Sequence, residues 1–170
     1  MSCNTLEGID KSCLGNLGGI RRLFLVKLED IDTIDGTDYW INVLTLSSGT
    51  EFVELVLNPN SASYNVSYSK DFLGIEEYAQ TITFKVNRRR RDTHNAIYTY
   101  LNGNPNIVAM VETVSGDWVL LGRDNGLNID SVNGGNAGTK DSGVNYDIEL
   151  SGVENSFEYF VKADVAESVI

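Results

Sequence analysis

The stretch from Gln80 to Gly122 constrains the fold most, because three kinds of local signal follow one another in it. Apolar and polar residues alternate strictly from Thr81 to Val86, which predicts a strand with one buried face. Two further apolar runs, Ile107–Glu112 and Trp118–Leu121, are joined through Ser115-Gly116-Asp117 and predict a hairpin. The stretch therefore supplies strands that a larger β-structure can be built around.

A short helix is expected between that first strand and the hairpin. Asp92 or Thr93 can cap its first turn, and apolar residues then recur three and four positions apart over residues 96–101. Gly103 suits a left-handed residue after the last turn, and Pro105 prevents the helix from resuming. One helix is therefore available to cover one face of a sheet.

Alternation and turn residues predict strands over most of the remaining chain. The strands expected are Ile20–Leu28, Tyr39–Leu46, Thr50–Leu57, Ala62–Lys70, Ala79–Asn87, Leu127–Val132, Ala137–Lys140, Val144–Leu150 and Glu158–Val165. We expect residues 39–46 to pair with 50–57 through the loop Ser47-Ser48-Gly49, with a bulge or helical turn near Trp40. Residues 62–70 are expected to pair antiparallel with 79–87.

These elements predict a mainly β fold, an antiparallel β-sandwich or barrel with one flanking α-helix. The 170 residues fit one domain, 1–170, since a chain of this length buries roughly 70% of its unfolded surface. Residues 1–19 hold four glycines and predict an extended N-terminal arm, and Ala166–Ile170 an exposed end. Asn133-Gly134-Gly135-Asn136 and Asp141-Ser142-Gly143 are predicted loops.

The densest acidic run is Glu29–Asp38, and Asp35-Gly36 within it is a turn dipeptide. An EF-hand loop would need oxygen ligands two residues apart before its glycine. Counting back from Gly36 places Ile31 and Thr33 at ligand positions, so this motif fails. The run is interpreted as a solvated acidic loop between two strands, and no metal or other cofactor is expected.

Charge and composition bound the class of partner. The chain has 24 acidic and 13 basic residues, a formal net charge of -11, which argues against a general nucleic-acid-binding surface or an anionic membrane as partner. The first residues show no signal peptide, and no apolar run approaches a membrane span. We therefore expect synthesis in a cytoplasm, with Cys3 and Cys13 as reduced packing thiols rather than zinc ligands.

No pattern of catalytic residues rises above chance. The single histidine, His94, falls in the first turn of the expected helix, where solvent exposure is the default. The sequence has no nucleophile elbow, P-loop, zinc-protease motif or dinucleotide-binding glycine pattern. The chain is therefore not expected to be an enzyme.

Four consecutive arginines, Arg88, Arg89, Arg90 and Arg91, form the one concentrated basic feature. A positive charge at a helix start is unfavourable for the helix dipole, which suggests that these side chains point to a partner. The favoured interpretation is a head-to-tail contact with the acidic run of another copy. A solvated turn and a nucleic-acid contact are the alternatives. The candidate contact residues on the acidic side are Asp30, Asp32, Asp35 and Asp38.

Two segments carry a resemblance to a known family. One runs from Cys3 through Gly8-Ile9-Asp10, Cys13 and Gly18-Gly19-Ile20 into an apolar strand. The other runs from Trp118-Val119-Leu120-Leu121-Gly122 through Asn125-Gly126-Leu127, Gly138 and Asp141 to Tyr146-Asp147-Ile148-Glu149-Leu150-Ser151-Gly152. Both resemble tail-tube-like and tail-ring, or neck, structural proteins of tailed bacteriophages that infect Bacteroidetes, the crAss-like phages and their relatives.

The resemblance implies a virion protein that forms six-fold or twelve-fold rings with itself, contacts other tail or neck proteins and lets DNA pass without binding it. An acidic lumen would repel phosphate, which agrees with the net charge. A carbohydrate- or receptor-binding β-sandwich is the alternative function. Its stacking platform would consist of Trp40, Trp118, Tyr64, Tyr68, Tyr98 and Tyr100, although the alternation of Tyr64 and Tyr68 with serines is typical of core residues.

Overall fold

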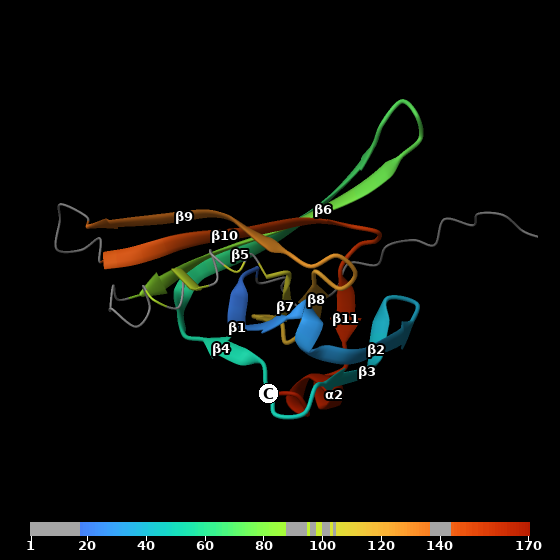
Figure 1. Ribbon diagram of the computed structural model, residues 1–170, viewed down its shortest axis with the longest axis horizontal. Helices are drawn as coiled ribbons and strands as arrows, with labels where there is room; N and C mark the ends of the chain where they lie inside the picture. The colour runs from blue at the N-terminus through green and yellow to red at the C-terminus, as the bar shows by residue number, and fades with distance from the viewer. Residues whose placement is uncertain (1–17, 88–94, 96–97, 100–102, 104, 137–143) are drawn as a thin grey trace, which may run out of the picture.

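Two sheets packed face to face form the protein (Figure 1). The computed structural model describes residues 18–87, 95, 98–99, 103, 105–136 and 144–170. The seven-stranded sheet has the order β2 (Ile31–Thr37), β3 (Trp40–Leu46), β11 (Tyr159–Val161), β8 (Trp118–Leu121), β7 (Ile107–Thr113), β1 (Ile20–Lys27) and β4 (Val53–Leu55). The four-stranded sheet has the order β5 (Leu57–Lys70), β6 (Glu76–Asn87), β10 (Val144–Glu154) and β9 (Asn128–Asn136). The helical segments with defined bounds are η1 (Leu28–Asp30) and α2 (Ala163–Glu167).

The seven-stranded sheet is covered on both faces, so its central strands are buried throughout. Its inner face packs on the four-stranded sheet, where Leu23 of β1 meets Phe84 of β6 and Leu150 of β10 in one hydrophobic core. Its outer face forms a second core, in which Phe24 of β1 and Met110 of β7 are covered by parts of β3 and α2. The predicted fold class, a mainly β sandwich with a flanking helix, is confirmed.

Several predicted pairings are confirmed. β5 and β6 pair antiparallel from Ala62↔Phe84 to Lys70↔Glu76, and β7 and β8 form the expected hairpin. The apolar side chains of β6 face the core, and β1 is apolar on both faces as expected of a covered strand. A register shift between Asp35 and Gly36 confirms the bulge expected in the β3 region.

The acidic run is not a loop, so that prediction is wrong. Residues 31–37 form β2, the edge strand of the larger sheet, and the two-residue turn lies at Asp38-Tyr39 instead of Asp35-Gly36. Ile31 and Ile34 pack against the second core, and that burial outweighs the poor strand propensity of the aspartates between them.

The expected hairpin between residues 39–46 and 50–57 does not form. β4 contains only three residues and pairs with β1 at the opposite edge of the sheet, in the register Leu25↔Val53. Phe52, 5% exposed, is buried in the second core and its N–H donates to the carbonyl of Val169. Burial of this side chain carries the segment across the end of the sheet and away from β3.

Two further predictions are wrong. The last strand, predicted over Glu158–Val165, contains only Tyr159–Val161, because α2 begins at Ala163. The predicted exposed end is correct at Glu167, Ser168 and Ile170, but Ala166 is fully buried. Residues 133–136 are not a loop, because they extend β9 along β10. Gly134 is required there, since a Cβ would lie 2.6 Å from the Tyr146 ring.

The helix expected after β6 falls largely outside the described residues. Asn95, Tyr98 and Thr99 are helical, and the Thr99 hydroxyl donates to the Asn95 carbonyl at 2.8 Å. Gly103 is helical too and does not have the left-handed conformation predicted for it. Residues 1–17, with Cys3 and Cys13, and residues 137–143 also lie outside the described part of the chain.

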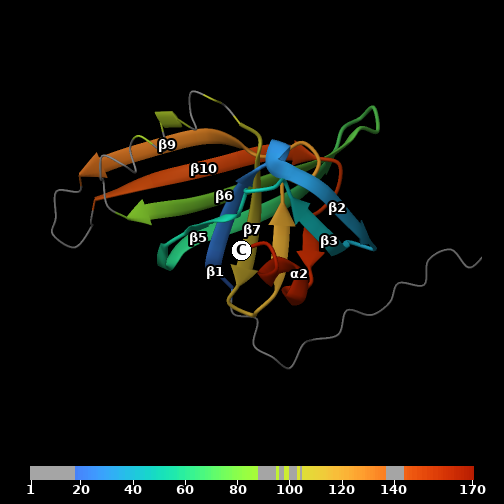
Figure 2. The same cartoon turned by 60° about the horizontal axis from the view of Figure 1, so that its bottom comes forward.

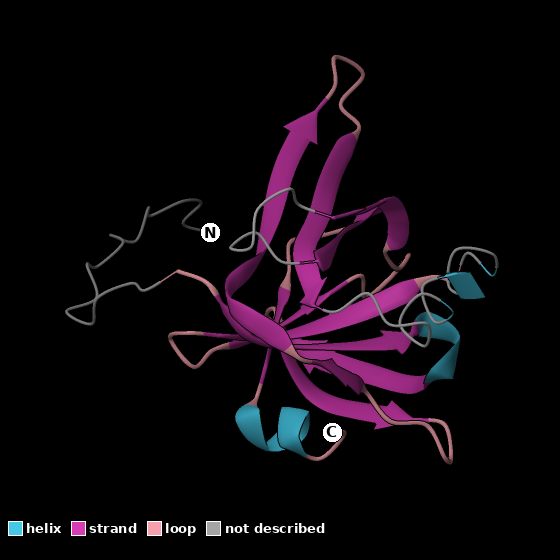
Figure 3. Ribbon diagram, turned by 90° about the vertical axis from the view of Figure 1, so that its left-hand side faces the viewer, coloured by secondary structure: helices cyan, strands magenta, loops and turns pink. Residues whose placement is uncertain are grey.

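The ends of β5 and β6 project beyond the sandwich as a long hairpin (Figures 1 and 3). We call residues 68–78 the hairpin arm. Its tip is fixed by Asp71, whose Oδ1 accepts hydrogen bonds from the N–H groups of Leu73 at 2.8 Å and Ile75 at 2.9 Å. The arm therefore has a defined tip, and its base contacts the sandwich through Tyr78 and Phe157, whose ring centroids lie 4.9 Å apart.

Gly152 of β10 provides a test of how tightly the two sheets are joined. An added Cβ would lie 2.6 Å from the carbonyl oxygen of Gly126 and 3.1 Å from the Leu127 side chain. We expect Gly152→Ala to lower the free energy of unfolding by about 1–3 kcal/mol, because backbone must move to admit the methyl group. Gly18→Ala, which meets no atom within 4 Å, is the control. Equal urea midpoints for the two variants would contradict this packing.

Candidate functional site

An open hollow lies beside the base of the hairpin arm. Its volume is about 710 Å³, and we call it the aromatic hollow. Four exposed aromatic residues and three carboxylates line it: Tyr39, Trp40, Phe157, Phe160, Asp38, Asp117 and Glu158. They come from the β2–β3 turn, the start of β3, the β7–β8 turn, the β10–β11 connection and β11. Four large aromatic side chains gathered at one surface are the usual mark of a binding site.

The β2–β3 turn aims two of these aromatic rings. Asp38 and Tyr39 have φ values of 53° and 64°, the positive pair that a tight two-residue hairpin turn requires. The carbonyl of Tyr39 accepts a hydrogen bond of 2.8 Å from the N–H of Phe160, which fixes β11 parallel to β3. The turn is therefore locked to a strand about 120 residues away in sequence.

Ring contacts across β3 and β11 hold the wall of the hollow. Trp40 lies opposite Phe160 in the register, with ring centroids 5.6 Å apart, and Tyr39 lies 5.7 Å from Tyr159. Such pairs stabilise the sheet beyond the area they bury. Trp40 remains 48% exposed, so its ring is supported on one side and open on the other.

The carboxylates make the rim of the hollow negative. The Ser115 hydroxyl donates to Oδ2 of Asp117 at 2.9 Å, which orients that side chain in the β7–β8 turn. Burial raises the pKa of Tyr64, which packs against the first core, and the charges of Glu158 and Asp117 raise it further. The field of these two acids therefore reaches into the sandwich.

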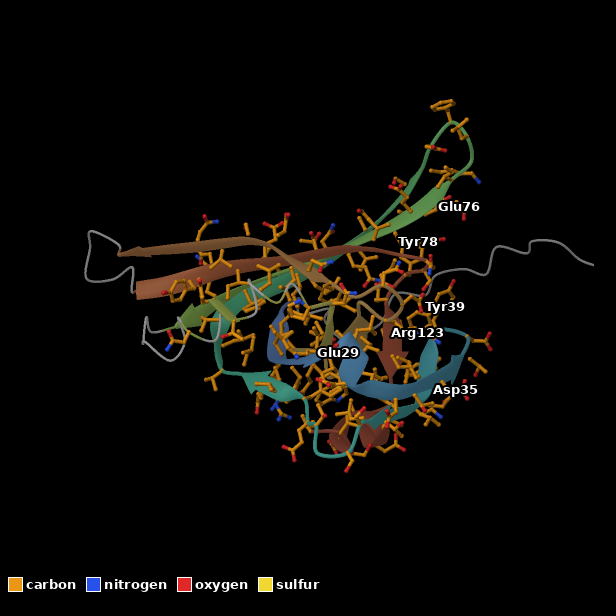
Figure 4. All side chains as sticks on the ribbon, viewed as in Figure 1. Glu29, Asp35, Tyr39, Glu76, Tyr78 and Arg123 are labelled. Atoms are coloured by element: carbon orange, nitrogen blue, oxygen red, sulfur yellow. The ribbon has the colours of Figure 1, made fainter. Side chains whose placement is uncertain are left out.

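One guanidinium already lies against this aromatic cluster. Arg123 sits over the ring of Tyr159, 4.3 Å from its centroid, and its Nε lies 3.8 Å from the carboxylate of Asp124. Figure 4 shows Tyr78, Tyr39 and Arg123 on the side of the molecule from which the arm projects. An aromatic surface with a negative rim suits a cation, and guanidinium most of all.

The arm and the aromatic hollow form one continuous surface. Tyr78 at the base of the arm contacts Phe157 of the hollow, with centroids 4.9 Å apart, and Tyr68 stacks on Tyr78 at 5.2 Å. At the tip, Phe72 is 95% exposed and Leu73 is 69% exposed. Apolar side chains this exposed on a projecting hairpin indicate contact with another molecule.

Glu154 supports the loop that carries Arg123, beside the aromatic cluster. Its carboxylate accepts hydrogen bonds from the backbone N–H groups of Asp124 (2.8 Å), Asn125 (3.1 Å) and Gly126 (3.0 Å). These bonds fix the loop that carries Arg123, while Glu154 itself begins the connection to Phe157. Burial raises the pKa of Glu154, and the three N–H donors oppose that rise.

The predicted acidic contact residues do not form a single cluster. Asp38 lines the aromatic hollow, whereas Asp32 and Asp35 are exposed along the edge strand β2. Asp32 accepts a hydrogen bond from the Ser47 hydroxyl at 2.9 Å, and the carbonyl of Asp30 accepts the Ser47 N–H at 2.9 Å. Arg88, Arg89, Arg90, Arg91 and His94 lie outside the described residues.

The predicted stacking platform is not assembled. Trp118 is 6% exposed in the second core and Tyr64 packs against the first, so Trp40 is the only described member of this set that lines the hollow. Tyr68 is 46% exposed, which corrects its interpretation as a core residue. Tyr98 is exposed elsewhere, and Tyr100 lies outside the described residues. The sequence analysis did not identify Tyr39, Phe157 and Phe160 as site residues. The only local signal for them was the run Asp38-Tyr39-Trp40, in which an acidic residue precedes two large aromatic residues.

Comparisons with protein-family models, curated proteins and solved structures found no match. Among the described residues, no three histidine, cysteine, aspartate or glutamate side chains are grouped so as to hold a metal ion. Within the same part of the chain, no helix has the length and apolar character needed to cross a bilayer.

Glu154→Gln tests the support of the hollow. We expect it to lower the free energy of unfolding by about 1–3 kcal/mol, because the amide NH₂ faces N–H donors that the carboxylate satisfied. The exposed Glu77→Gln is the matched control and should stay within about 0.5 kcal/mol of the wild type. Urea unfolding of both variants measures the difference.

The pH dependence of that difference gives a second result from the same variants. A pKa raised above 4.5 in the folded protein means that the folded state binds this proton more tightly than the unfolded state. The stability that Glu154 contributes is then greatest below pH 4.5, where the carboxyl group is protonated in both states. It falls as pH rises through the raised pKa of the folded protein. The advantage of wild type over Glu154→Gln should therefore shrink as pH rises above 4.5, the ordinary pKa of this carboxyl group. An advantage that grows would show that the N–H donors outweigh burial.

Proposed function

We propose that this protein is a non-enzymatic structural subunit that assembles into rings, as part of a phage tail tube or of the neck between head and tail. DNA would pass through the ring without binding to it. The observation that carries the proposal is the four-stranded sheet, which combines two unpaired edges with an outer face of small polar side chains. The resemblance of the sequence to tail-tube-like and tail-ring proteins supports the same conclusion.

The outer face of this sheet is hydrated and offers little for DNA to bind. Each outward side chain on this face neighbours, along its own strand, a residue that points into the first core. The outward set includes Ser63, Asn65, Ser67, Thr81, Thr83, Lys85, Ser131, Asn133, Asp147, Glu149 and Ser151. Lys85 is paired with Asp147 at 3.4 Å, so its charge is partly neutralised. Bases need aromatic platforms and phosphates need free cations, and these strands present neither among the residues named. Such a face suits the lining of a DNA conduit.

The two edges of the same sheet suit ring closure. Among the described strands, β5 and β9 each pair on one side only, and they lie at opposite ends of the strand order β5-β6-β10-β9. An unpaired edge exposes backbone N–H and C=O groups that another strand can satisfy. Pairing β9 of one copy with β5 of the next would place the polar faces of all copies on one continuous inner surface.

The hairpin arm supplies a contact beyond the sheet. It projects from one end of β5 and β6, so its apolar tip can reach a neighbouring copy or the next ring (Figures 1 and 3). Phe72 and Leu73 would bury most of their surface there, which stabilises assembly by roughly 1.5–3 kcal/mol for each side chain fully buried. The formal net charge of -11 keeps free subunits and DNA apart before and after assembly.

A second candidate is a carbohydrate- or receptor-binding module, and the aromatic hollow favours it. Exposed rings such as Trp40 can stack on sugar faces, and carboxylates such as Asp38 and Glu158 can accept sugar hydroxyl hydrogen bonds. This candidate accounts for the hollow but leaves the apolar arm tip and the two unpaired sheet edges without a role. The ring subunit is therefore the better-supported function.

Measurement of size tests the proposal directly. Light scattering after size exclusion should give a mass that is a multiple of six chains, and electron microscopy should show rings. The same material should not retain duplex DNA at roughly 0.15 M salt, because its surface repels phosphate. A protein that remains monomeric at all concentrations and binds a glycan array would support the second candidate instead.

The arm tip is tested by replacing Phe72 and Leu73 with serine. Both side chains are exposed in the free subunit, so the free energy of unfolding should change by less than about 0.5 kcal/mol. Assembly should require a higher protein concentration, because the variant loses apolar surface that the contact buries. Val56→Ser, at an 86% exposed position away from the arm, is the control. If all three proteins assemble alike, the arm is not a contact.

A further inference from the structure

We propose that the aromatic hollow of one copy binds the guanidinium groups of the Arg88–Arg91 run of the next copy. The inference rests on the proposed ring and names the contact that closes it. It also replaces the partner expected from sequence, since only Asp38 of the four acidic candidates lines the hollow.

The chemistry of the hollow matches arginine on two counts. Its aromatic faces, such as Trp40 and Phe157, attract a cation placed over the ring. Its carboxylates, Asp38, Asp117 and Glu158, accept the paired hydrogen bonds that a planar guanidinium donates. Lysine, a strongly hydrated point charge, gains less from such a site.

The protein already uses this arrangement within one chain. Arg22 lies over the ring of Phe24, 4.6 Å from its centroid, and its Nε lies 2.9 Å from a carboxylate oxygen of Glu54. The ion pair raises the pKa of Arg22 and lowers that of Glu54, with their hydrogen bond as the main cause. Arg123 over Tyr159 repeats the ring contact beside the hollow itself. The hollow differs in having aromatic and acidic groups without a cation among the residues that line it.

Chain geometry assigns the occupant to another copy. Tyr78 of β6 contacts Phe157 of the hollow, and β6 then runs nine residues further to Asn87, roughly 30 Å at about 3.3 Å per residue. Four extended residues span at most roughly 14 Å, so Arg91 cannot return to the hollow of its own chain. The end of β6 and the β2–β3 hairpin lie on opposite sides of the molecule in both views (Figures 1 and 2).

A donor and an acceptor at opposite ends of one subunit produce a head-to-tail contact. Such heterologous contacts close into rings when the rotation between copies allows it. Asp32 and Asp35 on the edge strand β2 add negative charge outside the hollow and would steer the arginines toward it.

The experiment uses a protein whose own arginines are removed, so that its hollow is free. In the variant with Arg88, Arg89, Arg90 and Arg91 replaced by serine, a labelled peptide of residues 85–95 should bind, as measured by fluorescence anisotropy. Adding Asp38→Asn and Glu158→Gln should weaken binding at least about tenfold, because the hollow then loses two of its three charges. Adding Asp164→Asn and Glu167→Gln on α2 removes the same charge elsewhere and should leave binding unchanged. A peptide with four lysines should bind more weakly than the arginine peptide.

Each result separates the contact from the ring. Equal loss of binding in both double variants would overturn the inference, because it would show attraction to net charge alone. Specific retention of the protein on a glycan array, lost with the hollow variants while peptide binding persists, would also overturn it. A peptide that binds as expected while the wild-type protein stays monomeric would support the arginine site and reject the ring. Rings that persist in the four-serine variant at the wild-type concentration would overturn the contact and leave the ring standing.

Discussion

The hydrogen bonds between Glu154 and the backbone of residues 124–126 fix the junction between the two sheets, on which the rest of the structure depends. Here the chain leaves the larger sheet after β8 and enters the smaller one at β9, and β10 returns in the opposite direction. Gln80 of β6 adds a second bond across the junction, accepting the N–H of Gly122 at 2.9 Å. Leu127 exchanges two backbone hydrogen bonds with Ile107, of 2.7 and 2.8 Å. These buried polar groups have hydrogen-bond partners across the junction. They therefore fix one relative placement of the two sheets, which a purely apolar interface would define less well.

Local alternation predicted the strands whose pairing partners are close in sequence. β5 with β6, and β7 with β8, follow from residues 62–86 and 107–121, because each strand buries one clear face and a short turn connects the pair. The same reasoning failed where tertiary burial decided. Ile31 and Ile34 make a strand of an aspartate-rich run, and Ala166 makes a buried helix of the chain end. No residue near either segment in sequence shows the second core that covers them.

The candidate site was harder to predict than the fold for a related reason. Trp40 was identified as a stacking residue, yet its partner Phe160 comes from a parallel strand pairing, which has no turn signal in sequence. Phe157 lies in the connection before that strand, and its ring packs against Tyr78 of β6, a long-range contact that no local pattern predicts. Asp38 was selected for its charge, but the positive φ of the turn decides that it lies in the hollow rather than along β2. The types of residue in the site could be identified from the sequence, but long-range strand pairing determines where they come together.

The surface has an apolar and aromatic region and a separate polar region, a division that the proposed assembly would explain. Apolar and aromatic groups gather on the arm and around the hollow, while the outer face of the four-stranded sheet carries small polar groups such as Ser63 and Thr83, which bond to each other at 2.9 Å. Edge strands such as β5 and β9, together with an apolar tip, would make most free subunits aggregate through any available edge. The high net negative charge opposes such encounters between copies at long range. In the proposed ring, the cluster of four arginines would overcome that repulsion at one place, so that charge would both prevent incorrect contacts and select the correct one.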